Sequence, residues 1–240
     1  MTTRAGQQEN KKRCPWVTEN PLYVDYHDHE WGRRPKADAA WFEALCLEAL
    51  QAGLSWLTVL QKRDAFRAIF SDFVPAKVAG MTDASLGKCL SDARLIRHKG
   101  KIWALRQNAH VFLDILKAWP RFEGYLAHVL QNTQIPKSPM HGTLHPKENA
   151  PSAPLQGIQA PDSQTAKYIS KAACAFQKAD APLPLKPLRG DASKAFTAML
   201  AKDLKKRGMR FVGPTTTYSF LEASDLVGGH APGCFLHTTN

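Results

Sequence analysis

Two short Cys/His pairs at opposite ends of this chain constrain its fold more than any other feature. Twelve residues separate Cys14 from His27 near the start, and three separate His230 from Cys234 near the finish. Two cysteines and two histidines are the ligand set of a closed tetrahedral zinc site. If the pairs meet, one structural zinc ion joins the two termini. The alternative is a buried cysteine and a surface histidine at each end, because nothing local brings such distant residues together.

The composition indicates a folded intracellular protein that suits a polyanionic partner. The chain has 240 residues, of which 44% are hydrophobic, and its formal net charge is +11. This excess of lysine and arginine favours nucleic acid, with a merely basic soluble protein as the alternative. The odd number of cysteines, five, favours thiols and a metal site over disulfides. Because no membrane-spanning run or secretory signal is visible, we expect a cytoplasmic, nucleoid-associated monomer with no membrane partner.

Apolar residues recur at helical spacing along much of the chain, and no stretch alternates with a period of two. These patterns predict an all-α fold. Helices are expected from Trp41 onwards with a cap at Ala37-Asp38, over 54–70, from Pro75, from Thr82 towards Arg94, from Gly100 to Trp119, and over 191–207.

The predicted domain organisation is one domain, 14–236, between a flexible basic tail at 1–13 and a short tail at 237–240. The domain is interrupted at about 131–187 by a stretch rich in proline and small polar residues. Such a composition cannot bury a core and predicts a loop or disordered insert. One isolated helix at 165–178 is the exception we expect within it.

Two clusters of aromatic and acidic residues predict a pocket for a flat ligand. The first, at 14–32, holds Trp16, Tyr26 and Trp31. In the second, at 47–56, Glu48 interrupts an apolar helical stripe and Trp56 follows a glycine break. A carboxylate on an apolar face is costly unless something pairs with it. Aromatic faces beside one acceptor suit a flipped nucleobase. The alternative is an ordinary aromatic core with Glu48 at its margin.

The segment 204–223 has the pattern of a helical hairpin. A basic helix end reaches Gly208, a turn reaches Gly213, and Pro214 suits the first position of another helix. A glycine turn before a helix presents backbone N–H groups to a phosphate. Nearby positive charges come from Lys205, Lys206, Arg207 and Arg210. This describes a helix-hairpin-helix DNA-binding element, and the alternative is a helix cap followed by a new helix with solvated charges.

These segments together resemble the motifs of the bacterial 3-methyladenine DNA glycosylase I family. In order they read CPWVTENPLYVDYHDHEWG, LEALQAGLSWLTVLQKR, DARLIRHKGKI, LKKRGMRFVGPTTTYSF and the closing HAPGC. The resemblance covers roughly 14–130 and 190–236. It implies a helix-hairpin-helix DNA glycosylase fold with zinc tying the termini. The implied activity is monofunctional hydrolysis of the N-glycosidic bond of 3-methyladenine in alkylated double-stranded DNA, leaving free 3-methyladenine and an abasic site.

The resemblance also implies residue roles. Zinc would be held by Cys14, His27, His230 and Cys234. Tyr26 and Glu48 would hydrogen-bond the methylated adenine, with Glu48 as the catalytic carboxylate. Trp56 would stack on the base, and Trp16 and Trp31 would wall the pocket. The DNA backbone would be contacted by Lys205, Lys206, Gly208, Arg210, Gly213 and Thr215. Leu54, after the glycine break, is either a wedge that enters the duplex or a core leucine.

The chain departs from the family pattern near its second Cys/His pair. Gly228-Gly229 stands where Asn-Asp is usual, which could loosen the metal site, and the stretch 226–230 offers no carboxylate. Other departures are Arg94 for glycine, Ala49-Leu50 before Gln51, Ala127 for tryptophan, and the long insert. They leave open a non-catalytic DNA-binding module that recognises alkylated or distorted DNA. A zinc-stabilised adaptor whose insert binds a protein is a third alternative.

Overall fold

The computed structural model describes residues 11–134, 183 and 187–237. Within these ranges the chain is helical and has no strand, and its one β contact is an isolated parallel bridge between Leu188 and Val227. The all-α expectation is therefore confirmed. None of the described helices is long and apolar enough to cross a membrane. The insert at 131–187, including the helix expected at 165–178, lies almost entirely outside the described ranges, so its organisation stays a prediction.

The helices are, in chain order, α1 (Pro21–His29), α2 (Asp38–Gln51), α3 (Trp56–Ile69), the 3-10 turn η1 (Ser71–Phe73), α4 (Pro75–Ala79), α5 (Asp83–Cys89), α6 (Lys99–Ala118), α7 (Phe122–Gln131), α9 (Gly190–Lys206) and α10 (Pro214–Ala223). Sequence analysis missed α1 and α7. The first begins where the Asn20 side chain accepts from the Leu22 N–H and Pro21 occupies the first turn. Both are ordinary start signals.

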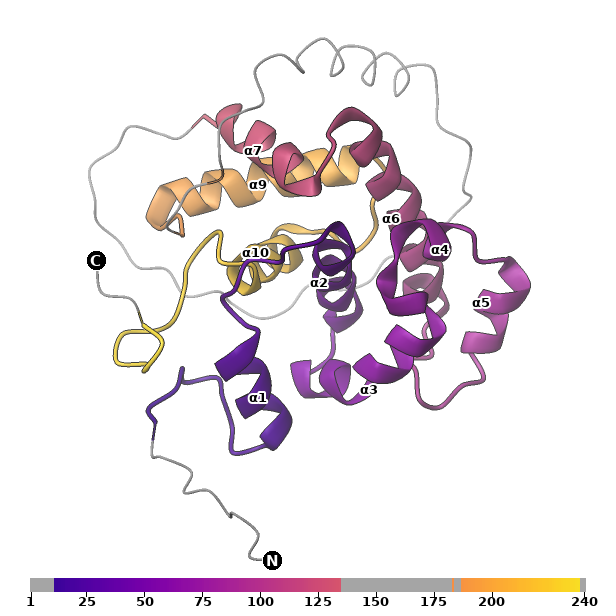
Figure 1. The fold of residues 1–240 in the computed structure, drawn as a ribbon, viewed down its shortest axis with the longest axis horizontal. Helices are drawn as coiled ribbons and strands as arrows, with labels where there is room; N and C mark the ends of the chain where they lie inside the picture. Colours follow the sequence, from indigo (N-terminus) through magenta and orange to yellow (C-terminus); the bar gives the residue numbers. More distant parts are fainter. Residues whose placement is uncertain (1–10, 135–182, 184–186, 238–240) are drawn as a thin grey trace, which may run out of the picture.

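Helix α2 lies at the centre of the fold and packs against α3, α6 and α10 (Figure 1). It is buried on nearly all sides, as expected for a helix with apolar residues around its whole circumference. Aromatic rings from several helices meet around it, including the stacked pair Phe112 and Phe122, whose centroids are 4.5 Å apart. Its largest fully buried side chains are Trp41, Phe42, Leu45 and Leu50.

Asp38 caps a different helix from the one that its sequence position suggested. Ala37 occupies the N-cap of α2 and makes no side-chain cap hydrogen bond. The carboxylate of Asp38 instead accepts from the Phe122 N–H, at 2.9 Å, where α7 begins. The first N–H groups of a helix have no partner within it, and Asp38 supplies one across the fold. This bond ties α2 to the start of α7.

Helices α9 and α10 form the predicted hairpin, and a buried asparagine of α6 fixes its turn. The side chain of Asn108 donates to the Arg210 carbonyl at 3.1 Å and accepts from the Arg210 N–H at 2.7 Å. Gly213 is the N-cap of α10, where no side chain caps the first N–H groups. The turn is therefore rigidly placed, and its first helical N–H groups remain open to an external acceptor.

The two ends of the described chain lie side by side, at the edge of the fold near α1 (Figure 1). The Phe235 N–H donates to the Lys12 carbonyl at 2.8 Å. A small apolar cluster, separate from the main core, gathers there. Its buried members are Cys14, Tyr26, Trp31, Leu60, Ala223 and Cys234.

Candidate functional site

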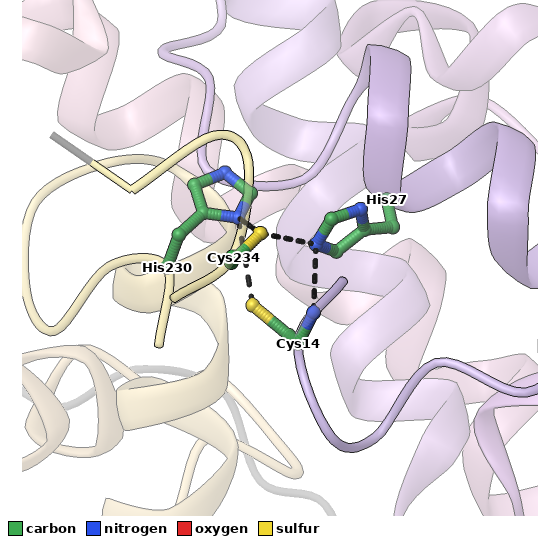
Figure 2. A group of neighbouring side chains, drawn as sticks. All are labelled: Cys14, His27, His230 and Cys234. Atoms are coloured by element: carbon green, nitrogen blue, oxygen red, sulfur yellow. Dashed lines mark hydrogen bonds between the residues drawn. The ribbon is translucent and has the colours of Figure 1, made fainter. Parts of the chain in front are cut away.

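The two Cys/His pairs meet, as the first expectation required (Figure 2). One ligand atom from each of Cys14, His27, His230 and Cys234 lies within 4.8 Å of all the others. Three sulfur-to-nitrogen separations are 3.5–3.6 Å. A tetrahedral zinc ion about 2.3 Å from sulfur and about 2.0 Å from nitrogen would hold these atoms about 3.5 Å apart. Both the donor set and its spacing therefore fit a tetrahedral metal ion.

Hydrogen bonds behind the cluster orient its ligand atoms. His27 Nδ1 lies 2.8 Å from the Asp28 carboxylate, which also accepts two bonds from Arg13, at 2.8 and 2.7 Å. The bond from Arg13 lowers the pKa of Asp28 to about 2, so the carboxylate is ionised and accepts from Nδ1. His27 Nε2 is thereby left facing the cluster, an arrangement typical of metal-bound histidine. Arg13 therefore supports the site, although sequence analysis placed it in the tail.

An aromatic wall rests directly on the Cys/His cluster. Trp31 stacks on His27, with ring centroids 6.1 Å apart, and meets His230 nearly at right angles, with ring centroids 4.8 Å apart. Trp16, two residues beyond Cys14, lies 5.1 Å from Trp31. Because these rings are bound to or packed on the cluster residues, the cluster sets the position of the wall.

A cavity of about 280 Å³ opens on the other side of this wall. Its size is near the lower end for small-molecule sites, about 300 Å³, and suits a single small ligand. The five residues expected to bind a base all line it. The complete lining consists of Trp16, Tyr23, Tyr26, Trp31, Glu48, Gln51, Ser55, Trp56, Ser219 and Glu222.

Glu48 brings a buried and incompletely bonded carboxyl group to the cavity. Only 6% of the residue is exposed, and its Oε2 has no hydrogen-bond partner among the described residues. The same is true of the Trp56 indole nitrogen. Burial, and then the nearby charge of Glu222, raise the pKa of Glu48 to about 8. Buried polar atoms are nearly always paired in proteins, so these two are available to a ligand.

Five residues of the lining are not among those predicted to bind a base. Tyr23 lies on α1, Gln51 is the last residue of α2, and Ser55 is the N-cap of α3. Ser219 and Glu222 both lie on α10, Glu222 near its end. Burial raises the pKa of Glu222 to about 7. The available signal was an acidic residue beside Phe220, Leu221 and Ala223, the same pattern that drew attention to Glu48. Glu222 lies four residues before the stretch 226–230, which offers no carboxylate.

The residues expected to contact DNA gather at the α9–α10 turn. Lys205, Lys206, Arg210, Gly213 and Thr215 are exposed there, and Gly208 is half-buried. The structure thus brings these residues together, as the hairpin pattern predicted.

Leu54 is 39% exposed, on the turn between α2 and α3 that Gly53 begins. The alternative of a core leucine is therefore wrong. The nearly buried ammonium group of Lys101 donates to the carbonyls of Leu50 and Ala52, at 2.8 and 2.6 Å. These bonds hold the turn that carries Leu54 next to the cavity residue Ser55.

Comparison with known proteins agrees with this geometry. The methyladenine glycosylase family model matches residues 16–158 and 149–237. DNA-3-methyladenine glycosylase 1 of Escherichia coli (strain K12) is 34% identical over 229 residues, or 95% of this chain and 98% of that protein. A crystal structure of 3-methyladenine DNA glycosylase I has 33% identity and a TM-score of 0.66, covering 95% of this chain and 100% of that one.

A further solved structure is a tyrosine-to-phenylalanine variant of 3-methyladenine DNA glycosylase I in complex with 3-methyladenine. It is 28% identical, with a TM-score of 0.64, and the match covers 95% of this chain and 99% of that one. The fold and the Cys/His cluster define a helical DNA glycosylase with a metal site that joins its termini. The chain belongs to the methyladenine glycosylase family.

Glu48 is expected to lower the stability of the fold as the pH rises. Its pKa is about 8 in the fold and 4.5 for an ordinary glutamate. The free energy of unfolding is therefore highest below pH 4.5, where Glu48 is protonated in both states, and it falls as the pH rises towards 8. We expect Glu48→Gln to raise the free energy of unfolding by roughly 2–4 kcal/mol at pH 8 and by under about 1 kcal/mol at pH 5. Urea unfolding at both pH values measures this, and an equal gain at both would contradict the assignment.

Proposed function

We propose that this protein hydrolyses the N-glycosidic bond of 3-methyladenine in DNA, releasing the free base and leaving an abasic site. The observation that carries the proposal is the aromatic cavity with its unpaired buried carboxyl group, in a chain of the methyladenine glycosylase family. The Escherichia coli relative bears the name of this activity.

The proposed base site combines ring faces with one carboxyl group. The rings of Tyr26 and Trp56 contact each other, with centroids 5.1 Å apart, and would together form one side of the base site. Methylation at N3 places a positive charge on adenine in DNA, and aromatic faces attract cations. Glu48 would accept a hydrogen bond from the exocyclic amine of the base. A neutral adenine gains less from these contacts, which favours the damaged base.

The cationic base is a good leaving group because of its positive charge. When the N-glycosidic bond breaks, its electron pair moves to the base and neutralises the charge there. The sugar carbon becomes electron-poor and takes the oxygen of water, which loses a proton. The described residues that line the cavity include no lysine, and this supports hydrolysis by water over attack by an amine. The proposed enzyme is therefore monofunctional, without a strand-cleaving step.

DNA binding is proposed to use the hairpin and the α2–α3 turn. The open N–H groups at the start of α10, with Arg210 beside them, suit a backbone phosphate. Leu54 would enter the duplex at the position that the flipped base leaves. Both elements are held rigidly, by Asn108 and by Lys101 respectively.

Base release is the first prediction. Purified protein mixed with methylated duplex DNA should release 3-methyladenine, separable from other bases by chromatography. Glu48→Gln and Trp56→Ala should each slow release by about 100-fold or more, because contacts with the departing base are lost.

Two controls make the release experiment decisive. Asp114→Asn changes a carboxyl group to an amide on the exposed surface of α6 and should leave release unchanged. Salt-sensitive DNA binding by wild-type protein, with no base released, would instead support the alternative of a non-catalytic binding module.

Arg210→Ala should weaken binding to duplex DNA equally for all sequences. Loss of one phosphate contact should reduce the slope of log affinity against log salt by about one. Fluorescence anisotropy at several salt concentrations gives this slope. Lys117→Ala, which removes an exposed charge at the end of α6, serves as the control. Equal slopes for wild type and Arg210→Ala would exclude Arg210 from the interface.

We further propose that the metal held by the Cys/His cluster is a single structural zinc ion. Four protein ligands fill a tetrahedral shell and leave no position for a reacting water. Desolvation raises the pKa of the Cys14 thiol to about 11, so a thiolate there requires a bound cation. When bound, the ion would contribute folding free energy by joining the termini.

Cys14→Ser should lose the bound zinc and melt at a lower temperature, because metal binding and folding are linked. Metal analysis and calorimetry measure the two effects. Cys89→Ser is the matched control, since Cys89 is also buried but lies outside the cluster. Zinc content equal to wild type in Cys14→Ser would rule out the assignment.

A further inference from the structure

The cavity contains a second carboxyl group, that of Glu222, which the proposed mechanism does not use. We propose that Glu222 is the specificity-determining anion of the cavity: its carboxylate selects a positively charged base, while Glu48 reads the hydrogen-bonding edge of that base. This inference rests on the proposed function, because it assumes that the cavity is the base site.

Glu222 and Glu48 reach the cavity from two helices packed against each other. Glu222 lies near the end of α10 and Glu48 in the buried last turn of α2, and both line the same space. Two carboxyl groups in one small cavity are costly unless they hold a proton or meet a cation. A cationic base satisfies both groups, whereas a neutral base leaves any negative charge without a partner.

The backbone at Gly228 leaves room for Glu222. A Cβ atom at this position would lie 2.7 Å from Glu222 Oε1 and 3.2 Å from the Tyr218 hydroxyl oxygen. Almost any side chain at 228 would therefore displace the carboxyl group. The glycine at 228 is thus coupled to the placement of Glu222. Its φ of +69° also favours glycine.

The surroundings of Glu222 are apolar and aromatic more than basic. The titratable groups around it are Glu48 of α2, Tyr23 and Tyr26 of α1, Tyr218 of α10 and, further off, Cys14 and Arg189. Burial, not a neighbouring charge, is the cause that raises its pKa. A cationic ligand would therefore be the main counter-charge to this carboxylate.

The two carboxyl groups differ in how readily they hold a proton, and this difference separates their roles. The pKa is about 7 for Glu222 and about 8 for Glu48. Glu48 is also the more deeply buried of the two, so a proton shared by the pair lies mainly on Glu48. A protonated carboxyl group both donates and accepts hydrogen bonds, so it can pair with the amine and a ring nitrogen of adenine. Environments that separate two carboxyl groups in this way commonly mark separate roles.

The test compares the binding of two free bases that differ in charge. The probes are 3,9-dimethyladeninium, which is permanently cationic, and 3-methyladenine above its own pKa, where it is neutral. Quenching of tryptophan fluorescence at pH 8 reports both dissociation constants with the full chain. We expect wild type to bind the cation at least about tenfold more tightly than the neutral base. In Glu222→Gln this ratio of dissociation constants should fall by about tenfold, while the affinity for the neutral base stays within about threefold of wild type.

Three variants serve as references. Glu48→Gln should weaken the binding of both probes to a similar extent, because it removes a contact with the base edge. Glu222→Asp, which retains the charge, should retain most of the preference. Asp114→Asn makes the same change in net charge far from the cavity lining and should behave as wild type.

The inference is overturned if Glu222→Gln keeps the wild-type preference for the cation, or if the substitution weakens binding of the neutral base as much as binding of the cation. A preference lost only in Glu48→Gln would assign the charge to Glu48 and also overturn it. Because binding is read without catalysis, a wild-type protein with the charge preference but no base release counts against the proposed reaction alone.

Discussion

The joining of two chain ends by the Cys/His cluster is the contact on which the base cavity depends. Cys14 and His230 are 216 residues apart in sequence, yet their ligand atoms meet at the edge of the fold. Trp31 packs on both histidines of the cluster, and Trp16 and Tyr26 lie one or two residues from its ligands. Helix α2 supplies only Glu48 and Gln51 to the cavity lining. Without the terminal segments this carboxyl group would face solvent instead of an aromatic wall.

Much of this arrangement could be predicted from sequence because its signals are local or chemically specific. The four ligands, the pocket residues Glu48 and Trp56, and the hairpin around Gly213 were all found by pattern. Glu222 carries the same local signal as Glu48, an acidic residue among apolar ones, but no local pattern indicates that its side chain reaches the cavity across the fold. Asp38 was assigned to the wrong helix for the same reason, since its partner is the Phe122 N–H. Helix α1 was overlooked because its aromatic and acidic residues serve the site and disturb the helical apolar pattern.

The cavity also shows how a functional requirement conflicts with folding. The buried carboxyl group of Glu48 and the half-buried one of Glu222 both have raised pKa values and reduce stability at neutral pH. The unpaired Trp56 indole adds to that cost. The large aromatic core around α2 offsets it. The rigid holds on the surrounding turns, Asn108 on the hairpin and Lys101 on the α2–α3 turn, keep the groups that would meet DNA in fixed positions relative to the cavity.

The separation of the fold into two apolar clusters has an evolutionary consequence. The wall of the cavity belongs to the small cluster at the termini, whereas the main core surrounds α2. Replacements in the wall therefore disturb few of the contacts that hold the rest of the molecule together. Pocket residues can therefore be exchanged while the scaffold persists. Ligand preference and foldability can then diversify almost independently.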